Sequence, residues 1–312
     1  LLSQPIGDVD LEGMPVVVAD LHSSLPAVLA GLRFPDGQEQ PRVAYIMTDG
    51  GALPLAYSRV VAVLSQAGWL TGTITAGQAW GGDIEAVSVH NALLAARHVL
   101  RADAAIVIQG PGNLGTETPW GFSGVACGDA INAVAALGGH PVACLRVSQA
   151  DARARHRGVS HHSMTAYGRV ALAGADIVVP DLEGPLGAQV RQEAEALCAP
   201  RPGAGQHRLV EVPADGLLEL LREAGVTIYF RCSPEVLVQR LELCKRTRPT
   251  IRDKSGAELE AFVRTTLLER APIYTRAHYT YDIDEIVSPR MERDFARQLA
   301  ADPRLRQPVL GG

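Results

Sequence analysis

Aromatic residues, paired cysteines and long apolar runs are all scarce in this chain. Aromatic residues are only 5% of the 312 residues although 47% are hydrophobic, and such a composition favours helices packed on a buried sheet over a β-sandwich or a propeller. The five cysteines form no Cys-x-x-Cys pair, which argues against a disulfide framework or a zinc knuckle and favours a reducing cytoplasm. No apolar run approaches the roughly 20 residues that cross a bilayer.

A strong excess of one charge is also missing. The chain has 29 Lys and Arg against 34 Asp and Glu, a formal net charge of −5. This balance gives no electrostatic reason to expect a nucleic acid or an acidic membrane as the partner. We therefore expect a small molecule as the partner. The sequence assigns no cofactor, and an oligomer is compatible with it.

Apolar runs alternate with segments of helical period over the first two thirds of the chain. The expected strands cover residues 15–19, 42–47, 70–75, 103–108, 141–147 and 176–179, and the expected helices cover 53–67, 85–101, 128–137, 163–173 and 188–199. Short connections between strands that are apolar throughout are typical of a parallel sheet with helices on both faces. The sequence therefore predicts a doubly wound, mostly parallel α/β fold.

A stretch rich in Pro and Gly, APRPGAGQH at 199–207, interrupts this pattern. It predicts a boundary between a first domain, 1–207, and a smaller C-terminal α/β segment, 208–312. In that segment, strands are expected at 208–212 and 226–231. Ser233 with Pro234 marks one helix start, and Ser255 with Glu258 forms a capping box at another.

Four polar loops, each containing glycine, follow successive predicted strands: TDGGALP at 48–54, GQAWGGD at 77–83, GPGNLGTET at 110–118, and 151–162, which ends in HRGVSHH. Because the carboxyl ends of parallel strands meet at one edge, we expect these loops to form one crevice. The candidate acids and bases are His161 or His162 with Asp49 or Asp83. The candidate ligand-binding residues there are Thr48, Gly50, Gly51, Gly110, Gly112, Gly115, Thr116, Arg155 and Arg157.

Several interpretations of these loops stay open. The third loop has the spacing GxGxxG, but proline at its second position and the missing acidic residue about 20 positions on disfavour a nicotinamide site. A cradle for phosphate or carboxylate fits the glycines better. A metal bound by the histidines would need help from Asp20, His22, Asp49 or Asp83 across the cleft. A solvated basic loop, and a ligand-binding or regulatory module without catalysis, explain the same residues.

Five long motifs resemble a bacterial family of unknown function, DUF3866. They are MPVVVADLHSSLP, AYIMTDGGALPLAYSR, GTITAGQAWGGDIEAV, IVIQGPGNLGTETPWGFSG and HRGVSHHSMT, and the likeness runs from about residue 13 to 221. The resemblance implies no reaction. It does imply that a further small domain precedes this one in members of the family.

The remainder resembles the C-terminal portion of shikimate kinases, from VTIYFRCSPEVLVQRLELCKRTRPTIRDK onward, over about 219–287. That resemblance implies that Arg248 belongs to a lid over ATP phosphates and that Arg270 holds a carboxylate. However, no GxxxxGK[ST] loop occurs in the sequence, and this loop is what cradles the phosphates in P-loop kinases. The sequence therefore indicates a fusion of two families. The sequence favours a protein that binds a small anionic ligand, and it does not specify the reaction. It disfavours an ATP-dependent phosphotransferase like shikimate kinase.

Overall fold

The structure is a computed structural model that describes residues 6–33, 40–149, 151, 153–214, 228–244, 251 and 253–303. The chain divides into two compact units, Leu1–Asp215 and Gly216–Gly312. The division lies further along than the predicted 207/208 boundary, because the strand Arg208–Pro213 pairs in the sheet of the first unit. No helix in the described ranges is long and apolar enough to cross a bilayer.

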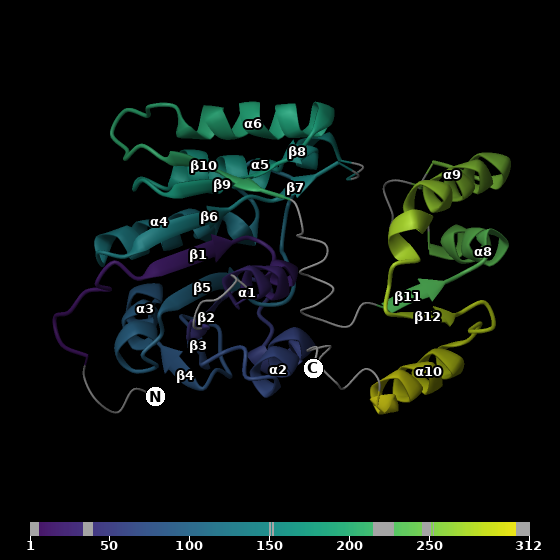
Figure 1. Ribbon diagram of the computed structural model, residues 1–312, viewed down its shortest axis with the longest axis horizontal. Coiled ribbons are helices and arrows are strands. Elements are labelled where there is room, and N and C mark those ends of the chain that lie inside the picture. The colour runs from purple at the N-terminus through teal and green to yellow at the C-terminus, as the bar shows by residue number, and fades with distance from the viewer. Residues whose placement is uncertain are drawn as a thin grey trace. The chain divides into compact units, whose positions relative to one another are not determined.

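The first unit is built on a parallel sheet of eight strands in the order β10-β9-β6-β1-β5-β2-β3-β4 (Figure 1). The predicted α/β class is confirmed. The strands are β1 (Pro15–Ala19), β2 (Val43–Thr48), β3 (Gly72–Ala76), β4 (Ile84–Ala86), β5 (Ala104–Gln109), β6 (His140–Cys144), β9 (Asp176–Asp181) and β10 (Arg208–Pro213). A short antiparallel pair, β7 (Val147–Ser148) and β8 (Gly158–Val159), stands outside this sheet. All residues of β5 are buried, as expected of a strand covered on both faces.

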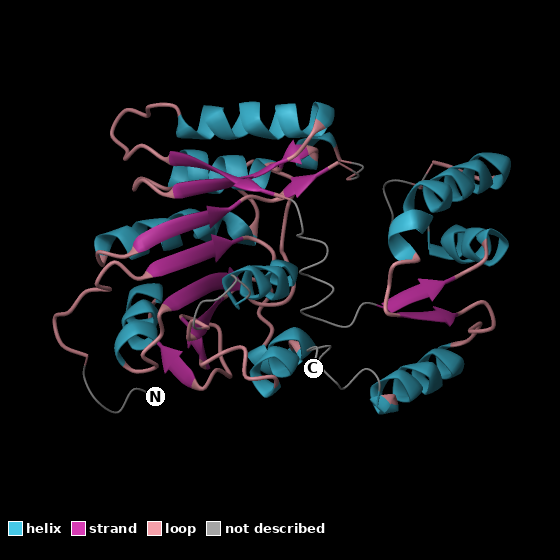
Figure 2. Cartoon of the chain, in the orientation of Figure 1, coloured by secondary structure: helices cyan, strands magenta, loops and turns pink. Residues whose placement is uncertain are grey.

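The direction of winding reverses at the centre of the sheet. From β1 the chain runs to β2, β3 and β4 on one side, then returns to β5 beside β1 and continues to β6, β9 and β10 on the other. Because such crossovers are right-handed, the helices that lead into β2 and β3 and those that lead into β5, β6, β9 and β10 are expected on opposite faces of the sheet. The α-helices in the described part of this unit, cyan like all helices in Figure 2, are α1 (Leu25–Arg33), α2 (Arg59–Gln66), α3 (Val89–His98), α4 (Ala126–Ala136), α5 (His161–Thr165) and α6 (Gly184–Cys198).

Two local differences from the predicted elements have plain causes. The helix predicted for 53–67 begins only at α2, because Ser58 accepts a hydrogen bond from the Val61 amide (3.1 Å) and caps it. The segment predicted as one helix over 85–101 instead opens with strand β4 and continues as α3 after Ser88, the N-cap residue. Short edge strands such as β4 have too few residues to show a period of their own.

The second unit contains a parallel pair of strands, β11 (Ile228–Arg231) and β12 (Tyr279–Asp282). Three helices accompany them in the described residues: α8 (Pro234–Cys244), α9 (Gly256–Tyr274) and α10 (Pro289–Ala301). Its buried core consists of Ile251, Leu259 and Val263, with side chains of α8 packed against them. The helix starts predicted at Ser233 and Ser255 are both present, although the Ser255 side chain makes no capping hydrogen bond.

Candidate functional site

Asp20 is the centre of the polar site. It directly follows β1, where the winding of the sheet reverses, and its side chain is only 5% exposed. Such a switch point, outside the carboxyl ends of the strands, is the usual ligand site of open α/β sheets. Gly124, at the entrance to α4, packs so closely on the Asp20 carboxylate that a Cβ there would overlap it. The carboxylate therefore has a fixed position under the start of a helix.

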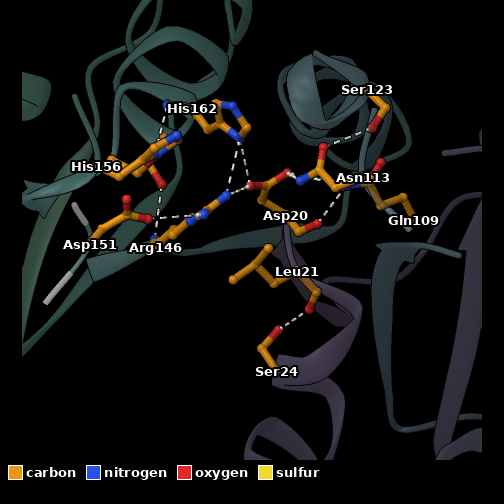
Figure 3. Close-up of polar contacts among 12 residues, drawn as sticks. Asp20, Leu21, Ser24, Gln109, Asn113, Ser123, Arg146, Asp151, His156 and His162 are labelled. Atoms are coloured by element: carbon orange, nitrogen blue, oxygen red, sulfur yellow. Dashed lines mark hydrogen bonds and ion pairs between the residues drawn. The ribbon is translucent and has the colours of Figure 1, made fainter. Parts of the chain in front are cut away.

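Four side chains from distant parts of the chain converge on this carboxylate (Figure 3). On one side, His162 Nδ1 lies 3.0 Å and Arg146 Nη1 lies 3.5 Å from Oδ2. On the other side, Gln109 Nε2 and Asn113 Nδ2 donate to Oδ1 at 3.3 and 3.4 Å. A carboxylate accepts only, so Nδ1 of His162 carries the proton of this hydrogen bond. That leaves Nε2 as the basic nitrogen of the ring.

His162 is positioned by aromatic packing as well as by Asp20. Its ring stacks on Phe122 with centroids 3.9 Å apart and planes 6° apart. The ring of His161 lies edge-on to it at 4.5 Å, and that of His156 at 5.0 Å. His156 is itself fixed, because its Nδ1 lies 2.7 Å from the Ser160 hydroxyl. Three imidazole rings therefore share one small volume beside the carboxylate.

Burial and neighbouring cations lower the pKa values of two of these imidazoles, His156 and His161, and so favour their neutral forms. Burial, together with Arg146 and Arg153, lowers the pKa of His156 to about 4. Burial, His162 and Arg155 also lower the pKa of His161. Neutral imidazole accepts a proton or binds a metal ion, whereas imidazolium does neither.

These residues line a cavity of about 290 Å³. Its wall is formed by Leu21, Asn113, Gly115, Glu117, Thr118, Gly121, Phe122, Arg146, Arg153, Arg155, His156, His161 and His162. Two of the three arginines have close acidic partners: Arg146 has Asp20, and Arg153 makes a double hydrogen bond with Asp151 at 2.9 Å for both contacts.

Arg155 is the least satisfied of these arginines. Its Nη2 lies 3.3 Å from an oxygen of Glu117, whose side chain is 78% exposed. Its Nε is buried and has no hydrogen-bond partner among the described residues. A buried N–H without a partner is costly, so this arginine has hydrogen-bonding capacity that the described residues do not use.

The structure brings some of the predicted site residues to this cavity. Gly115, Arg155, His161 and His162 line it. Thr116 lies beside it and bonds the hydroxyl of Thr118 at 3.0 Å. The third and fourth loops therefore meet as expected.

Other residues of the first and third loops lie at the same sheet edge but not in the cavity wall. Asp49 is exposed, and its carboxylate accepts the Ala52 amide at 3.2 Å. A Cβ at Gly51 would stand 3.2 Å from the Pro111 carbonyl oxygen, so the two loops pack on each other. Also outside the wall are Thr48, Gly50, Gly110 and Gly112.

The placement predicted for Asp83 is wrong. Its carboxylate accepts both the amide and the hydroxyl of Thr73 at 2.8 Å, near the amino end of β3. The loop 77–83 runs from the carboxyl end of β3 back to the amino end of β4, because the two strands are parallel. Asp83, the last residue of this loop, therefore lies at the amino edge of the sheet and not at the carboxyl edge. Arg157 is not in the cavity wall either, and it donates from Nε to the Asp151 carbonyl oxygen at 3.0 Å.

The two arginines of the C-terminal resemblance belong to the second unit. Arg270 donates from Nη1 to the Tyr274 hydroxyl on the same helix at 3.3 Å. Arg248 lies outside the described residues.

Sequence reasoning did not include several residues of the site among its candidates. They are Asn113, Phe122 and Arg146, and Asp20 was considered only as a helper for a metal. A usable signal existed for Asp20, because it is the first polar residue after an apolar strand at the carboxyl edge. Arg146 was hidden inside the predicted strand 141–147, whereas β6 ends at Cys144.

Residues 6–229 match the family described as Protein of unknown function (DUF3866). The chain belongs to this family. The match covers the whole described part of the first unit, and so all residues of the cavity belong to the DUF3866 region. The sequence resemblance is confirmed.

Residues 212–300 match the shikimate kinase family. The shikimate kinase of Parabacteroides distasonis is 39% identical over 82 residues, which are 26% of this chain and 47% of the relative. That of Bacteroides thetaiotaomicron is 36% identical over 69 residues, 22% of this chain and 39% of the relative. This chain therefore spans less than half the length of these curated relatives. A crystal structure of the Bacteroides thetaiotaomicron shikimate kinase aligns at 24% identity with a TM-score of 0.25, over 37% of this chain and 66% of that one.

Proposed function

We propose that the DUF3866 unit binds a small anionic metabolite, one that carries a phosphate or carboxylate group, in the cavity beside Asp20. The observation that carries the proposal is Arg155, whose buried Nε has no partner among the described residues while its guanidinium group lines the cavity. An arginine fork of this kind matches the two oxygens of a carboxylate or phosphate.

The surroundings of Arg155 support an anion of modest size. The cavity volume of about 290 Å³ is at the lower end of the range of ligand pockets, about 300 to 1,000 Å³. The side-chain amide of Asn113 and the hydroxyl of Thr118 also line it, and both can donate hydrogen bonds. Arg146 and Arg153 are already paired with Asp20 and Asp151, and Glu117 is the carboxylate that an anion at Arg155 has to displace.

The histidines give the bound anion a source or acceptor of protons. Asp20 orients His162 from behind, the arrangement in which a carboxylate fixes the tautomer of a catalytic base. His161 lies next to it and also lines the cavity. We infer that acid–base chemistry on the anion would use one of these two rings.

The test is calorimetric titration of the full chain with inorganic phosphate and with citrate. Binding is expected in the wild type and is expected to weaken about tenfold or more in Arg155→Ala, since a charge-assisted hydrogen bond contributes about 1.5 to 3 kcal/mol. Arg155→Lys keeps the charge but loses the fork, so it should recover only part of the affinity.

Arg191→Ala is the matched control. Arg191 is an exposed arginine of α6 that pairs with Asp181 and Glu211, remote from the cavity wall. Phosphate and citrate affinities equal in the Arg155→Ala and wild-type chains would contradict the proposal. So would an equal loss in Arg191→Ala, because it would indicate a general effect of surface charge.

We do not extend the proposal to phosphorylation of shikimate. The chain spans less than half of the shikimate kinases it matches. Its glycine-rich loops contain no lysine, whereas phosphoryl transfer depends on a cradle of backbone amides and a lysine around the phosphates.

A further inference from the structure

Three histidine rings meet in one wall of the cavity. One ring nitrogen each of His156, His161 and His162 lies within 4.8 Å of the other two. They come from a short segment, the 3-10 turn Ala154–His156 and the first turn of α5. His156 and His162 are 2% and 8% exposed, so their rings have little freedom to turn toward solvent.

The hydrogen bonds of two of these rings leave the same nitrogen free. Nδ1 of His162 is engaged by Asp20, and Nδ1 of His156 by Ser160. In each ring Nε2 has no hydrogen-bond partner in the described part of the chain. Histidines that bind metals typically have the other ring nitrogen held by a carboxylate or another polar group, which fixes the tautomer and the ring orientation. Asp20 holds the Nδ1 atom of His162 in this way, and Ser160 holds the Nδ1 atom of His156.

His161 completes the group. Across the ranges that the structure describes, its ring makes no hydrogen bond, although it lies beside His156, His162 and Phe122 at centroid distances of 4.9, 4.5 and 5.6 Å. Packing alone therefore positions its ring, so it can rotate to bring a nitrogen toward the other two.

We propose that His156, His161 and His162 together bind one divalent transition-metal ion, with zinc as the reference ion. Imidazole nitrogen suits zinc, nickel, copper and iron, whereas magnesium and calcium prefer oxygen ligands. In a tetrahedral site with metal–nitrogen bonds of about 2.0 to 2.1 Å, the nitrogens are about 3.4 Å apart. The present separations of up to 4.8 Å are wider, and a rotation of the His161 ring is a movement that shortens its distances to the other two nitrogens.

Three protein ligands leave one coordination position open. Zinc sites with three protein ligands and an open position are typical of catalytic zinc, whereas structural zinc is closed by four. Arg155 and Asn113 line the same cavity as the three histidines. A role of the ion toward an anion there rests on the proposed anion binding and replaces the acid–base role of His161 or His162, whose ring nitrogens the ion occupies. Binding of the ion itself does not depend on the anion.

The experiment is a calorimetric titration of the chelator-treated, dialysed full chain with zinc chloride, and separately with magnesium chloride. We expect one zinc ion per chain and no comparable binding of magnesium. His161→Ala should weaken zinc binding by about 100-fold or more, and Asp20→Asn, which changes only the group behind a ligand, by about 10-fold to 100-fold. His90→Ala, an exposed histidine on α3, should leave the affinity unchanged.

A spectroscopic measurement on the wild type guards against variants that fail to fold. In the chain labelled with nitrogen-15, zinc should move the Nε2 resonances of His156 and His162 and leave their Nδ1 resonances protonated. Absence of zinc binding, an unchanged affinity in His161→Ala, or coordination through Nδ1 would each overturn the inference.

The two proposals fail separately. Phosphate binding by the chelator-treated chain that depends on Arg155, without any zinc binding, would leave the anion site standing and remove the metal site. Zinc binding that depends on His161, without phosphate or citrate binding in either the metal-free or the zinc-loaded chain, would support the metal site and remove the anion site.

Discussion

Replacing Asp20 by Asn tests whether this carboxylate organises the site. The substitution keeps the shape of the side chain but removes its charge and one acceptor oxygen. Asp20 is 5% exposed and interacts with His162 Nδ1 at 3.0 Å and Arg146 Nη1 at 3.5 Å. His162 Nδ1 and Arg146 Nη1 both contact Oδ2, the oxygen that Asn replaces by an NH2 group, and at so buried a position solvent does not supply a new acceptor.

The size of the effect follows from these contacts. Removing one partner of a buried ion pair costs about 3 to 5 kcal/mol, and a hydrogen bond to a charged group contributes about 1.5 to 3 kcal/mol. The Arg146 contact is long, and the arginine side chain is 18% exposed and also lies 3.9 Å from Asp151. We therefore expect Asp20→Asn to lower the free energy of unfolding by about 2 to 3 kcal/mol, at the low end of these ranges.

Urea unfolding followed by tryptophan fluorescence measures this change for the first compact unit, which contains Asp20. All 3 tryptophans, Trp69, Trp80 and Trp120, belong to the first unit, so their emission reports its unfolding separately from the second. Asp49→Asn is the matched control, because Asp49 is exposed and accepts a single backbone amide. It should change the stability by no more than about 0.5 kcal/mol. An Asp20→Asn chain as stable as Asp49→Asn would refute the reasoning.

Three further outcomes are expected. Gly124→Ala should lower the melting temperature because its Cβ would overlap the carboxylate behind it, whereas Gly31→Ala in α1, which meets nothing within 4 Å, should be neutral or raise it. Acidification should destabilise the first unit from about pH 6.5 downward. Burial lowers the pKa of His207, as it does for His156 and His161, so the unfolded chain takes up protons first. His207→Gln should therefore reduce the slope of stability against pH in urea titrations at pH 8 to 5. Finally, the full chain should release no ADP with ATP, magnesium and shikimate in a coupled assay. Turnover of about 1 to 100 per second that vanished in Arg270→Ala would show that the missing phosphate loop had been replaced.

The pH prediction has a structural basis beyond burial. Nδ1 of His207 accepts the Ala175 amide at 3.0 Å, while Nε2 lies 2.8 Å from the Tyr167 carbonyl oxygen and donates to it. Only the neutral ring can accept at one nitrogen and donate at the other. Protonation therefore breaks the bond to Ala175 in the folded state. A slope that persisted unchanged in His207→Gln would assign the pH dependence to other groups.

Local sequence patterns were sufficient for the architecture. The six strands predicted for the first domain all exist, with boundaries that shift by a few residues, because a strand buried on both faces is a continuous apolar run between glycines and prolines. The same patterns indicated the edge where the third and fourth loops meet, since parallel strands place all their carboxyl ends together. His161, His162 and Arg155 were accessible to sequence reasoning for this reason.

Only the tertiary structure decided which of the polar residues at that edge act together. Asp20 and His162 are 142 positions apart, and no spacing in the sequence couples them. Their contact depends on the order of the strands, which places β1 beside both β5 and β6. The position of Asp83 also depends on a pairing between strands. Asp83 directly precedes β4, a three-residue strand too short to show a period, and β4 runs parallel to β3, so Asp83 lies at the amino edge of the sheet. Sequence periodicity records which face of an element is buried, whereas the neighbours of an element depend on pairings between segments far apart in the chain.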